Sequence, residues 1–324
     1  MIALPDFVQI EPVGHCNLRC RMCPVQFRTD APPAFMEYAA FTSLIDQFPA
    51  MKRLQLQGLG EPFMHPQFLQ MVRYAASRGI EVSVNTNLTL ITPRIARETI
   101  ASGLAYLYGS IDGATPGTYE AIRLGANFAK VTRNLRRLLD ARRDAGSASP
   151  LIALVYVLMR RNLAELPAFV ELAGGWGVDT VNVQNLCHDF GESTLPPHYR
   201  PMREFVEEET ILNEDPERVD AVFSAAKRIA ERIGIELHLP NAQRNVMRKP
   251  GCSWPWNGAY FSFTGEAMPC CMVATPDRAS MGNALDEGVQ RLWDGERYSA
   301  FRDALESDTP PEICRTCAVY NGTF

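Results

Sequence analysis

The chain lacks several features that would place it in a common class of protein. No apolar run reaches the roughly 18 residues that a membrane span requires. Residues 1–6 have neither the basic nor the apolar region of a secretion signal. The net charge of −5 provides no basic excess for nucleic acid, and there is no internal repeat or low-complexity tract. We therefore expect a cytoplasmic protein with no membrane partner and no nucleic-acid partner.

The composition is otherwise that of an ordinary globular protein, with 46% hydrophobic and 21% charged residues. A chain of 324 residues can form one large domain and a small one. Nine cysteines in a chain without a secretion signal indicate metal binding rather than disulfides. Three of them lie near residue 20, five follow residue 250, and Cys187 stands alone between the two groups.

Segments with strand-like and helix-like patterns alternate over the first half of the chain. The sequence predicts strands at 7–12, 53–57, 81–85, 105–111, 151–159 and 180–184, and helices at 38–49, 66–78, 93–103, 116–123, 128–145 and 163–176. Six such β/α units are typical of a partial (β/α)6 barrel, an open relative of the TIM barrel. In such barrels the chemistry lies at the carboxyl ends of the strands.

The pattern changes after residue 187, which we take as the end of the barrel domain, 1–187. Residues 188–216 are polar and rich in proline, and we predict a lid loop that faces the substrate. A helix at 217–234 and a linker complete a connecting segment, 188–245. The remaining residues, 246–324, form a third predicted unit.

Three cysteines with C-x3-C-x2-C spacing follow the first predicted strand, namely Cys16, Cys20 and Cys23. Three thiolates on one loop can hold three irons of a cubane cluster and leave the fourth iron open. An open coordination position is a mark of catalytic metal sites. Zinc fits this triplet poorly, because zinc sites use C-x2-C pairs and four protein ligands.

This triplet resembles that of the radical S-adenosylmethionine (radical SAM) superfamily. The resemblance implies a [4Fe-4S] cluster whose open iron chelates SAM, and cleavage of SAM to methionine and a 5′-deoxyadenosyl radical that abstracts hydrogen from a substrate. It also implies an electron donor similar to flavodoxin or ferredoxin. Met22 stands where the family often has an aromatic residue near the adenine.

Further residues resemble the SAM-binding positions of that family. Gly60 and Glu61 follow the second predicted strand, and the resemblance implies that they bind the ammonium group of SAM. Asn87, Ser110 and Arg123 match other cofactor-binding positions, with the serine near the ribose and the arginine near the carboxylate of SAM. The alternative is a helix cap at residues 110–113 and an ordinary surface arginine.

The later cysteines resemble the SPASM/twitch extension of radical SAM enzymes, which carries auxiliary iron–sulfur clusters. Cys252, Cys270, Cys314 and Cys317 suffice for one second [4Fe-4S] cluster, with a hairpin predicted over 261–268. Cys271 follows Cys270 directly, and adjacent side chains on a strand face opposite ways, so we expect only Cys270 to bind iron. A zinc site made by the same four cysteines is the alternative.

Cys187 ends the last predicted strand of the barrel and is our candidate catalytic residue. A thiol can give a hydrogen atom to a carbon radical, which would make the protein an epimerase; without that donor, oxidation of a carbinol to a ketone would make it a dehydrogenase. Free cysteines are more commonly buried core residues. The resemblance to aminocyclitol and aminoglycoside enzymes leads us to expect a small hydroxylated, sugar-like substrate.

Two other functions stay open. Modification of a ribosomally made peptide is the first, although a barrel that starts near residue 7 leaves no room for an N-terminal leader-binding domain. A metal-binding scaffold without catalysis is the second, and the intact triplet with Glu61 and Arg123 argues against it.

Overall fold

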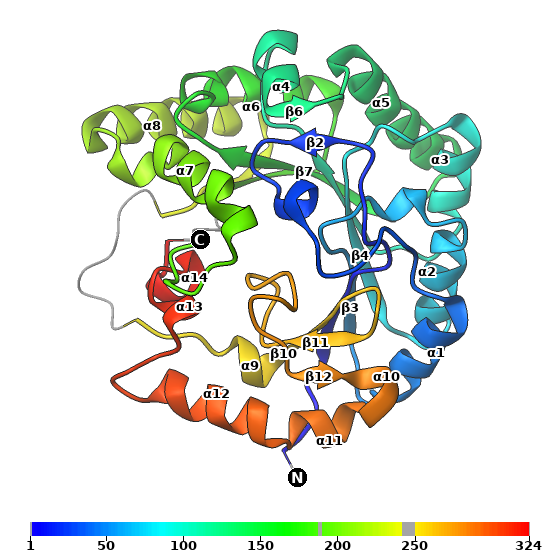
Figure 1. The fold of residues 1–324 in the computed structure, drawn as a ribbon. Coiled ribbons are helices and arrows are strands. Elements are labelled where there is room, and N and C mark those ends of the chain that lie inside the picture. The colour runs from blue at the N-terminus through cyan, green and yellow to red at the C-terminus, as the bar shows by residue number, and fades with distance from the viewer. Residues whose placement is uncertain (1, 187–189, 242–249, 324) are drawn as a thin grey trace.

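A ten-stranded sheet forms the centre of the molecule (Figure 1). The computed structural model describes residues 2–186, 190–241 and 250–323. The strands of the sheet follow the order β12-β11-β10-β1-β3-β4-β5-β7-β8-β9. All neighbouring pairs from β10 to β9 are parallel, and only β11 and β12 run antiparallel to their neighbours.

Six consecutive strands of this sheet are those of the predicted barrel: β1 (Phe7–Ile10), β3 (Arg53–Leu56), β4 (Glu81–Thr86), β5 (Tyr106–Ser110), β7 (Leu151–Leu158) and β8 (Thr180–Asn185). From Val82 in β4 and from Val181 in β8, buried side chains alternate with half-buried ones. This period of two arises because successive side chains of a strand face opposite sides of the sheet. The buried set packs against helices.

The helices between these strands lie on the outer side of the curved sheet (Figure 1). They are α1 (Tyr38–Asp46), α2 (Phe68–Ala76), α3 (Pro93–Ile100), α4 (Pro116–Ile122), α5 (Phe128–Asp144) and α6 (Leu166–Trp176). Two of them, α3 and α4, begin with proline after a threonine cap: the side chains of Thr92 and Thr115 accept from backbone N–H groups. The predicted partial (β/α)6 barrel is therefore confirmed.

A short ribbon, β2 (Arg19–Cys20) with β6 (Arg123–Leu124), stands apart from the main sheet. A seventh parallel strand, β9 (Glu236–His238), extends the sheet beyond β8 and follows helix α8 (Pro216–Ile233). The sequence analysis did not predict either feature, since strands of two and three residues carry too little pattern.

The predicted lid loop at 188–216 is only partly a loop. Residues 200–209 form helix α7 (Arg200–Glu209), with Met202, Val206 and Glu209 buried on one face. Proline at position 201 suits a first helical turn, and the loop prediction was wrong there because it gave the prolines too much weight. Short 3-10 turns flank α7 at Pro197–Tyr199 and Ile211–Asn213.

The C-terminal segment continues the same sheet. Strand β10 (Gly258–Phe261) pairs in parallel with β1, and β11 (Glu266–Met268) and β12 (Gly282–Asn283) follow. The predicted hairpin is confirmed, with Gly265 in the left-handed conformation at its turn (φ 83°). The helices are α9 (Trp254–Asn257), α10 (Ala284–Glu287), α11 (Val289–Trp293), α12 (Glu296–Glu306), α13 (Glu312–Arg315) and α14 (Ala318–Asn321).

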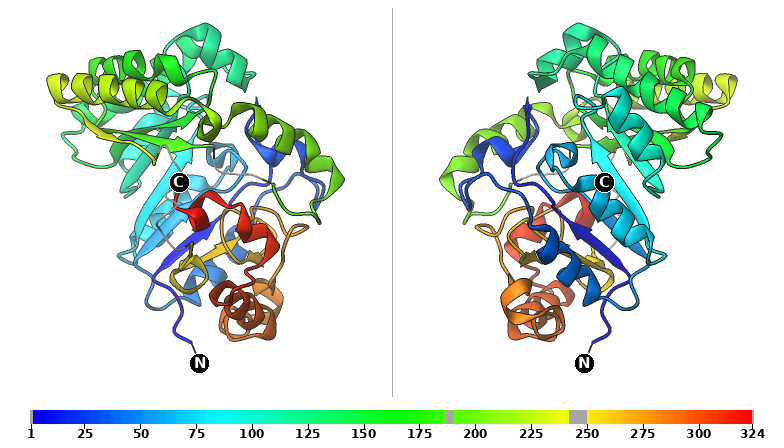
Figure 2. Two further views of the ribbon diagram at one scale, coloured as in Figure 1. Left: turned by 90° about the vertical axis from the view of Figure 1, so that its left-hand side faces the viewer. Right: turned by 90° about the vertical axis from the view of Figure 1, so that its right-hand side faces the viewer.

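The C-terminal helices α11 and α12 and the helices α6 and α8 lie at opposite ends of the sheet (Figure 2). Residues 190–199 contact the C-terminal segment through a buried ion pair between Arg278 and Glu192 at 2.6 Å.

The domain boundaries at residues 187 and 245, which the sequence analysis proposed, stay a prediction. In the part of the chain that the structure describes, no helix is long and apolar enough to cross a membrane.

A buried ionic contact joins β1 to the hairpin. Glu11, which is fully buried, accepts from Arg28 at 2.7 Å and from the backbone N–H of Leu59 at 2.8 Å. The guanidinium of Arg28 also lies 4.8 Å from the ring centre of Phe263 in the hairpin. Burial raises the pKa of Glu11, and the charge and hydrogen bond of Arg28 oppose that rise.

We expect Arg28→Met to destabilise the fold by about 3–5 kcal/mol, because it leaves the Glu11 carboxylate buried without its cation. Adding Glu11→Gln should recover only part of the loss, because Asp30, which lies 2.7 Å from Arg28 and is 5% exposed, also loses its cation. Urea unfolding, followed by tryptophan fluorescence without oxygen, measures both. Arg53→Met is the matched control: its partner Asp6 is 41% exposed, so the change should stay within about 1 kcal/mol. Equal losses in both single variants would contradict this account.

Candidate active site

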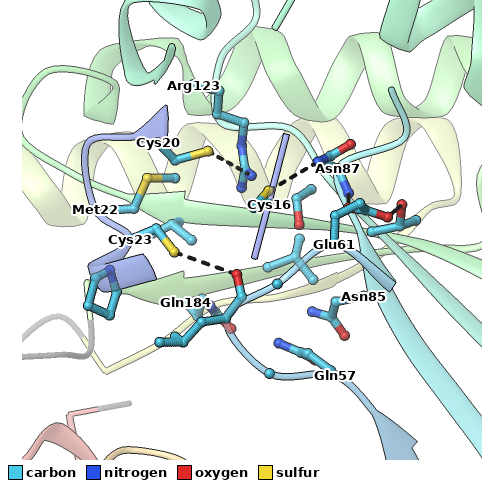
Figure 3. Close-up of a pocket in the computed structure, with 18 of the residues that line it drawn as sticks. Cys16, Cys20, Met22, Cys23, Gln57, Glu61, Asn85, Asn87, Arg123 and Gln184 are labelled. Carbon is cyan, nitrogen blue, oxygen red and sulfur yellow. Dashed lines mark hydrogen bonds between the residues drawn. The ribbon is translucent and has the colours of Figure 1, made fainter. Parts of the chain in front are cut away.

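The three clustered cysteines line one pocket at the carboxyl ends of the barrel strands (Figure 3). All three lie on the loop between β1 and α1, and Cys20 is fixed by the pairing of β2 with β6. The described residues include every cysteine except Cys187, so the candidate hydrogen donor lies outside the described residues.

Each sulfur of the triplet has a polar neighbour. Cys16 accepts from the backbone N–H of Leu18 at 3.4 Å and from the side-chain amide of Asn87 at 3.6 Å. Cys20 accepts from Nη1 of Arg123 at 3.8 Å. The thiol of Cys23 points to the backbone carbonyl of Leu59 at 3.9 Å. N–H donors of this kind stabilise thiolates.

Burial raises the pKa of all three thiols, with Cys16 at about 11. Without metal these side chains are protonated at neutral pH, and binding iron must displace the protons. Three sulfurs on one loop, two of them beside N–H donors, are a donor set suited to a cubane cluster with one open iron.

Among the described residues, no three Cys, His, Asp or Glu side chains are placed to hold one ion. Tetrahedral zinc with bonds near 2.3 Å needs its sulfurs only about 3.8 Å apart. In a cubane each cysteine binds a different iron, so the sulfurs stand farther apart.

Gly60 and Glu61 lie beside the cluster loop and line the same pocket. The backbone N–H of Glu61 donates to the carbonyl of His15 at 3.0 Å. A Cβ at Gly60 would come within 2.0 Å of the carbonyl oxygen of Val13, so only glycine allows this close approach.

The Glu61 carboxylate is held by protein groups rather than standing free in the pocket. It accepts from the hydroxyl of Thr86 at 2.7 Å and from the backbone N–H of Asn87 at 2.8 Å, and it is 3% exposed. Burial raises its pKa and these hydrogen bonds oppose the rise. The carboxylate thus fixes the loop after β4, and its contact with SAM stays a prediction.

Arg123 is likewise not an ordinary surface arginine. It is 7% exposed, and its Nε donates to the fully buried Asp112 at 2.6 Å. Burial alone would lower the pKa of Arg123, but Asp112 and Cys20 raise it above its usual value. Asp112 also accepts from the backbone N–H of Val157 at 2.8 Å. The residue predicted to approach the SAM carboxylate therefore lies next to a cluster cysteine.

The pocket brings the predicted residues together and adds others. Ser110, Asn87 and Met22 all line it. Figure 3 also shows Gln57, Asn85 and Gln184 below the triplet, and sequence reasoning missed these three. The sequence could have indicated them, because each is a polar residue near the carboxyl end of a predicted strand, where barrel enzymes place their active-site residues.

A second set of cysteines gathers in the C-terminal segment. Burial, together with the nearby sulfurs of Cys317 and Cys252, raises the pKa of Cys270 to about 12. Gly251 donates from its backbone N–H to the carbonyl of Tyr320 at 3.0 Å, which holds Cys252 beside α14. Cys314 and Cys317 lie around the turn between α13 and α14, with a backbone hydrogen bond of 3.2 Å between them.

Cys270 and Cys271 both pack against a small cluster of buried residues that includes Tyr260 and Met268. The sulfurs of Cys252 and Cys317 lie near Cys270. This supports Cys270 as the iron ligand, which stays a prediction.

Two family models match the chain. The Radical SAM superfamily model matches residues 10–173, and a model of an iron-sulfur cluster-binding domain, SPASM, matches residues 252–318. The two matches cover the barrel helices and strands as far as α6 and nearly all of the C-terminal segment.

Curated relatives and solved structures agree with these matches. The tungsten-containing aldehyde ferredoxin oxidoreductase cofactor-modifying protein of Pyrococcus furiosus is 27% identical, over 97% of this chain and 87% of its own. The PqqA peptide cyclase of Xanthomonas campestris is 23% identical, over 97% and 79%. The fold is similar to SuiB of Streptococcus suis bound to the precursor peptide SuiA, with a TM-score of 0.72 at 12% identity, over 99% of this chain and 71% of SuiB.

These relatives contradict part of the sequence analysis. A small-molecule partner, sugar-like or aminocyclitol-like, with epimerisation or carbinol oxidation as the reaction, was wrong: the PqqA peptide cyclase, which matches this chain over 97% of its length, is named for a peptide. The error came from taking the number of auxiliary cysteines as a guide to the substrate.

The triplet, its pocket and the matched models agree: the chain belongs to the Radical SAM superfamily, as an enzyme with a C-terminal SPASM domain, and its cofactors are a SAM-binding [4Fe-4S] cluster, an auxiliary cluster and SAM.

Proposed function

We propose that the protein is a radical SAM enzyme that modifies a peptide. The observation that carries the proposal is the likeness to PqqA peptide cyclase, which extends over 97% of the chain and so includes both the barrel and the C-terminal segment. The alternative of a scaffold without catalysis is disfavoured by the pocket, which joins the cysteine triplet to Glu61 and Arg123.

In this proposal each group of residues has a separate task. Cys16, Cys20 and Cys23 hold the first cluster, and Cys252, Cys270, Cys314 and Cys317 hold the second. When bound, the first cluster supplies the electron that cleaves SAM. Gly60 lets the backbone approach SAM, Ser110 lies in the same pocket, and Glu61 and Asn87 order the loops that surround it.

The proposal is tested with short peptides encoded next to the gene of this protein. We expect one of them to increase 5′-deoxyadenosine formation by the reconstituted, reduced enzyme and to change its own mass. Liquid chromatography with mass spectrometry measures both. SAM cleavage that no peptide stimulates, with all peptide masses unchanged, would count against a peptide substrate.

Iron content separates the two cysteine sets. We expect about eight irons per chain, and replacement of Cys16, Cys20 and Cys23 by alanine should halve that number and abolish SAM cleavage. Cys271→Ala is the matched control and should keep the full iron content. Zinc in the second site, or loss of iron in the control, would overturn the ligand assignment.

Arg123 should also influence the electron affinity of the first cluster. A guanidinium beside Cys20 stabilises the more negative, reduced cluster. Arg123→Gln should therefore make the midpoint potential more negative, while Arg123→Lys, which keeps the charge, should shift it less. Potentiometry with EPR detection, in the absence of SAM, measures the shift.

Arg19→Gln is the control for that measurement. Arg19 lies next to Cys20 in sequence, but its side chain is exposed. Its loss removes the same formal charge without removing an N–H···S contact. Equal potentials for Arg123→Gln and the wild type would show that Arg123 acts only as the partner of Asp112.

A further inference from the structure

The inner face of the barrel is polar, which is unusual for parallel strands. Strands buried on both faces are near-continuous apolar runs, and β7 has that pattern. In contrast, β4, β5 and β8 place polar residues at every inward position: Ser83 and Asn85, Tyr106 and Tyr108, Asn182 and Gln184. All six are half-buried.

The strand register places these side chains on one surface. Ser83 pairs with Gln55 on one side and Tyr106 on the other, and Asn85 pairs with Tyr108. Asn182 lies opposite the inward Val155 of β7. Together they line a cavity of about 530 Å³, which lies within the range of ligand pockets in proteins.

This cavity, which we call the chamber, adjoins the SAM pocket. Asn85, Val155 and Gln184 line both. Figure 3 shows Asn85 and Gln184 on the side of the pocket below the cysteine triplet. A group bound in the chamber therefore lies directly beside the site where SAM is expected to react.

The opposite end of the chamber reaches the C-terminal segment. Phe7 and Arg53 line the chamber and also a groove formed by residues around Cys252 and Trp254. The chamber thus shares lining residues with the pocket of the first cysteine set and with the groove that contains Cys252.

Several polar groups in the chamber have no partner of their own. Among the described residues, the side chains of Asn182, Gln184, Tyr106 and Tyr108 form no hydrogen bond, although Gln55 donates to Gln57 at 2.6 Å. Half-buried amides and hydroxyls without partners favour a ligand that supplies donors and acceptors.

The charges are confined to one end. Of the described residues that line the chamber, only Arg53 and Glu81 are charged, and both lie at the amino ends of their strands, away from the SAM pocket. Arg53 is already paired with Asp6. A charged side chain inserted beside Asn85 and Gln184 would lose its hydration. The two charged groups of the adjoining SAM pocket, Glu61 and Arg123, are already held by other protein groups.

We propose that the chamber is the subsite for the reacting residue of the substrate, and that it selects an uncharged side chain with a hydrogen-bonding group, such as glutamine or tyrosine. This inference rests on the proposed peptide substrate and specifies which residue of the peptide enters the barrel.

The test uses the reconstituted holoenzyme with two sets of probes: pentapeptides acetyl-Gly-Gly-X-Gly-Gly-amide, and the single capped residues acetyl-X-amide, with X as Gln, Tyr, Leu, Lys or Glu. The readout is 5′-deoxyadenosine formation with the probe, divided by the rate without it. We expect Gln and Tyr probes to stimulate about tenfold more than Lys, Glu or Leu probes, the equivalent of one or two hydrogen bonds.

Variants of the chamber complete the test. Asn182→Leu should abolish the preference for Gln over Leu, and Tyr108→Phe, which removes only a hydroxyl, should weaken it. Asn182→Asp should raise the stimulation by the Lys probe. Gln70→Leu removes an amide from the exposed face of α2 and is the control, with the preference unchanged. Iron content verifies that every variant is folded and loaded.

The outcomes separate the two proposals. If capped single residues and pentapeptides show the same preference among side chains, the result supports the proposed role of the chamber. The same result overturns the proposal that the substrate is a peptide. Stimulation by pentapeptides regardless of X, or a preference unaltered in Asn182→Leu and Tyr108→Phe, overturns the chamber. No stimulation by any uncharged polar probe overturns it as well.

Discussion

The parallel pairing of β1 on both sides is the constraint on which the rest of the structure depends. On one side β1 pairs with β3, which leads to the Gly60–Glu61 loop, and on the other with β10 of the C-terminal segment. Its own carboxyl end leads into the cysteine triplet. Because one strand carries or contacts all three segments, a shift of β1 by one residue would misplace the cluster, the SAM loop and the hairpin together. The fully buried Glu11 directly after β1 reinforces this register, since it holds Arg28 and Leu59 at once.

Much of the fold and the first cofactor site could be predicted from the sequence. The barrel strands and helices have clear periodicity, and the C-x3-C-x2-C spacing is local, so the motif can be recognised without tertiary information. The glycine at position 60 could be recognised as a site of close approach, which the carbonyl of Val13 explains. The hairpin turn at Gly265 was also readable, because a left-handed residue favours glycine.

Other features depend on tertiary contacts that no local pattern contains. The pairing of β10 with β1 joins residues about 250 apart in the sequence. The partners of Arg123, namely Asp112 and Cys20, come from two different segments of the chain, so the sequence alone could not identify them. The resemblance implied that Arg123 approaches SAM, and the structure also places it in contact with a cysteine of the triplet. The polar inner face was visible as alternation in β4 and β8, but alternation alone does not say that the second face encloses a cavity. The substrate class was wrong for a related reason: the number of auxiliary cysteines does not determine it, and a relative that matches nearly the whole chain is named for a peptide.

The β2–β6 ribbon also bears on how the metalloprotein is assembled. Cys20 pairs with Arg123, so the first cysteine loop reaches its final shape only after the chain has folded as far as α4 and β6. The second set spans from Cys252 to Cys317 and needs both β10 and the C-terminal helices in place. Because metal binding and folding are coupled, a nascent chain would complete its two iron sites one after the other. Until each site is complete, its thiols are exposed to oxidation while synthesis continues.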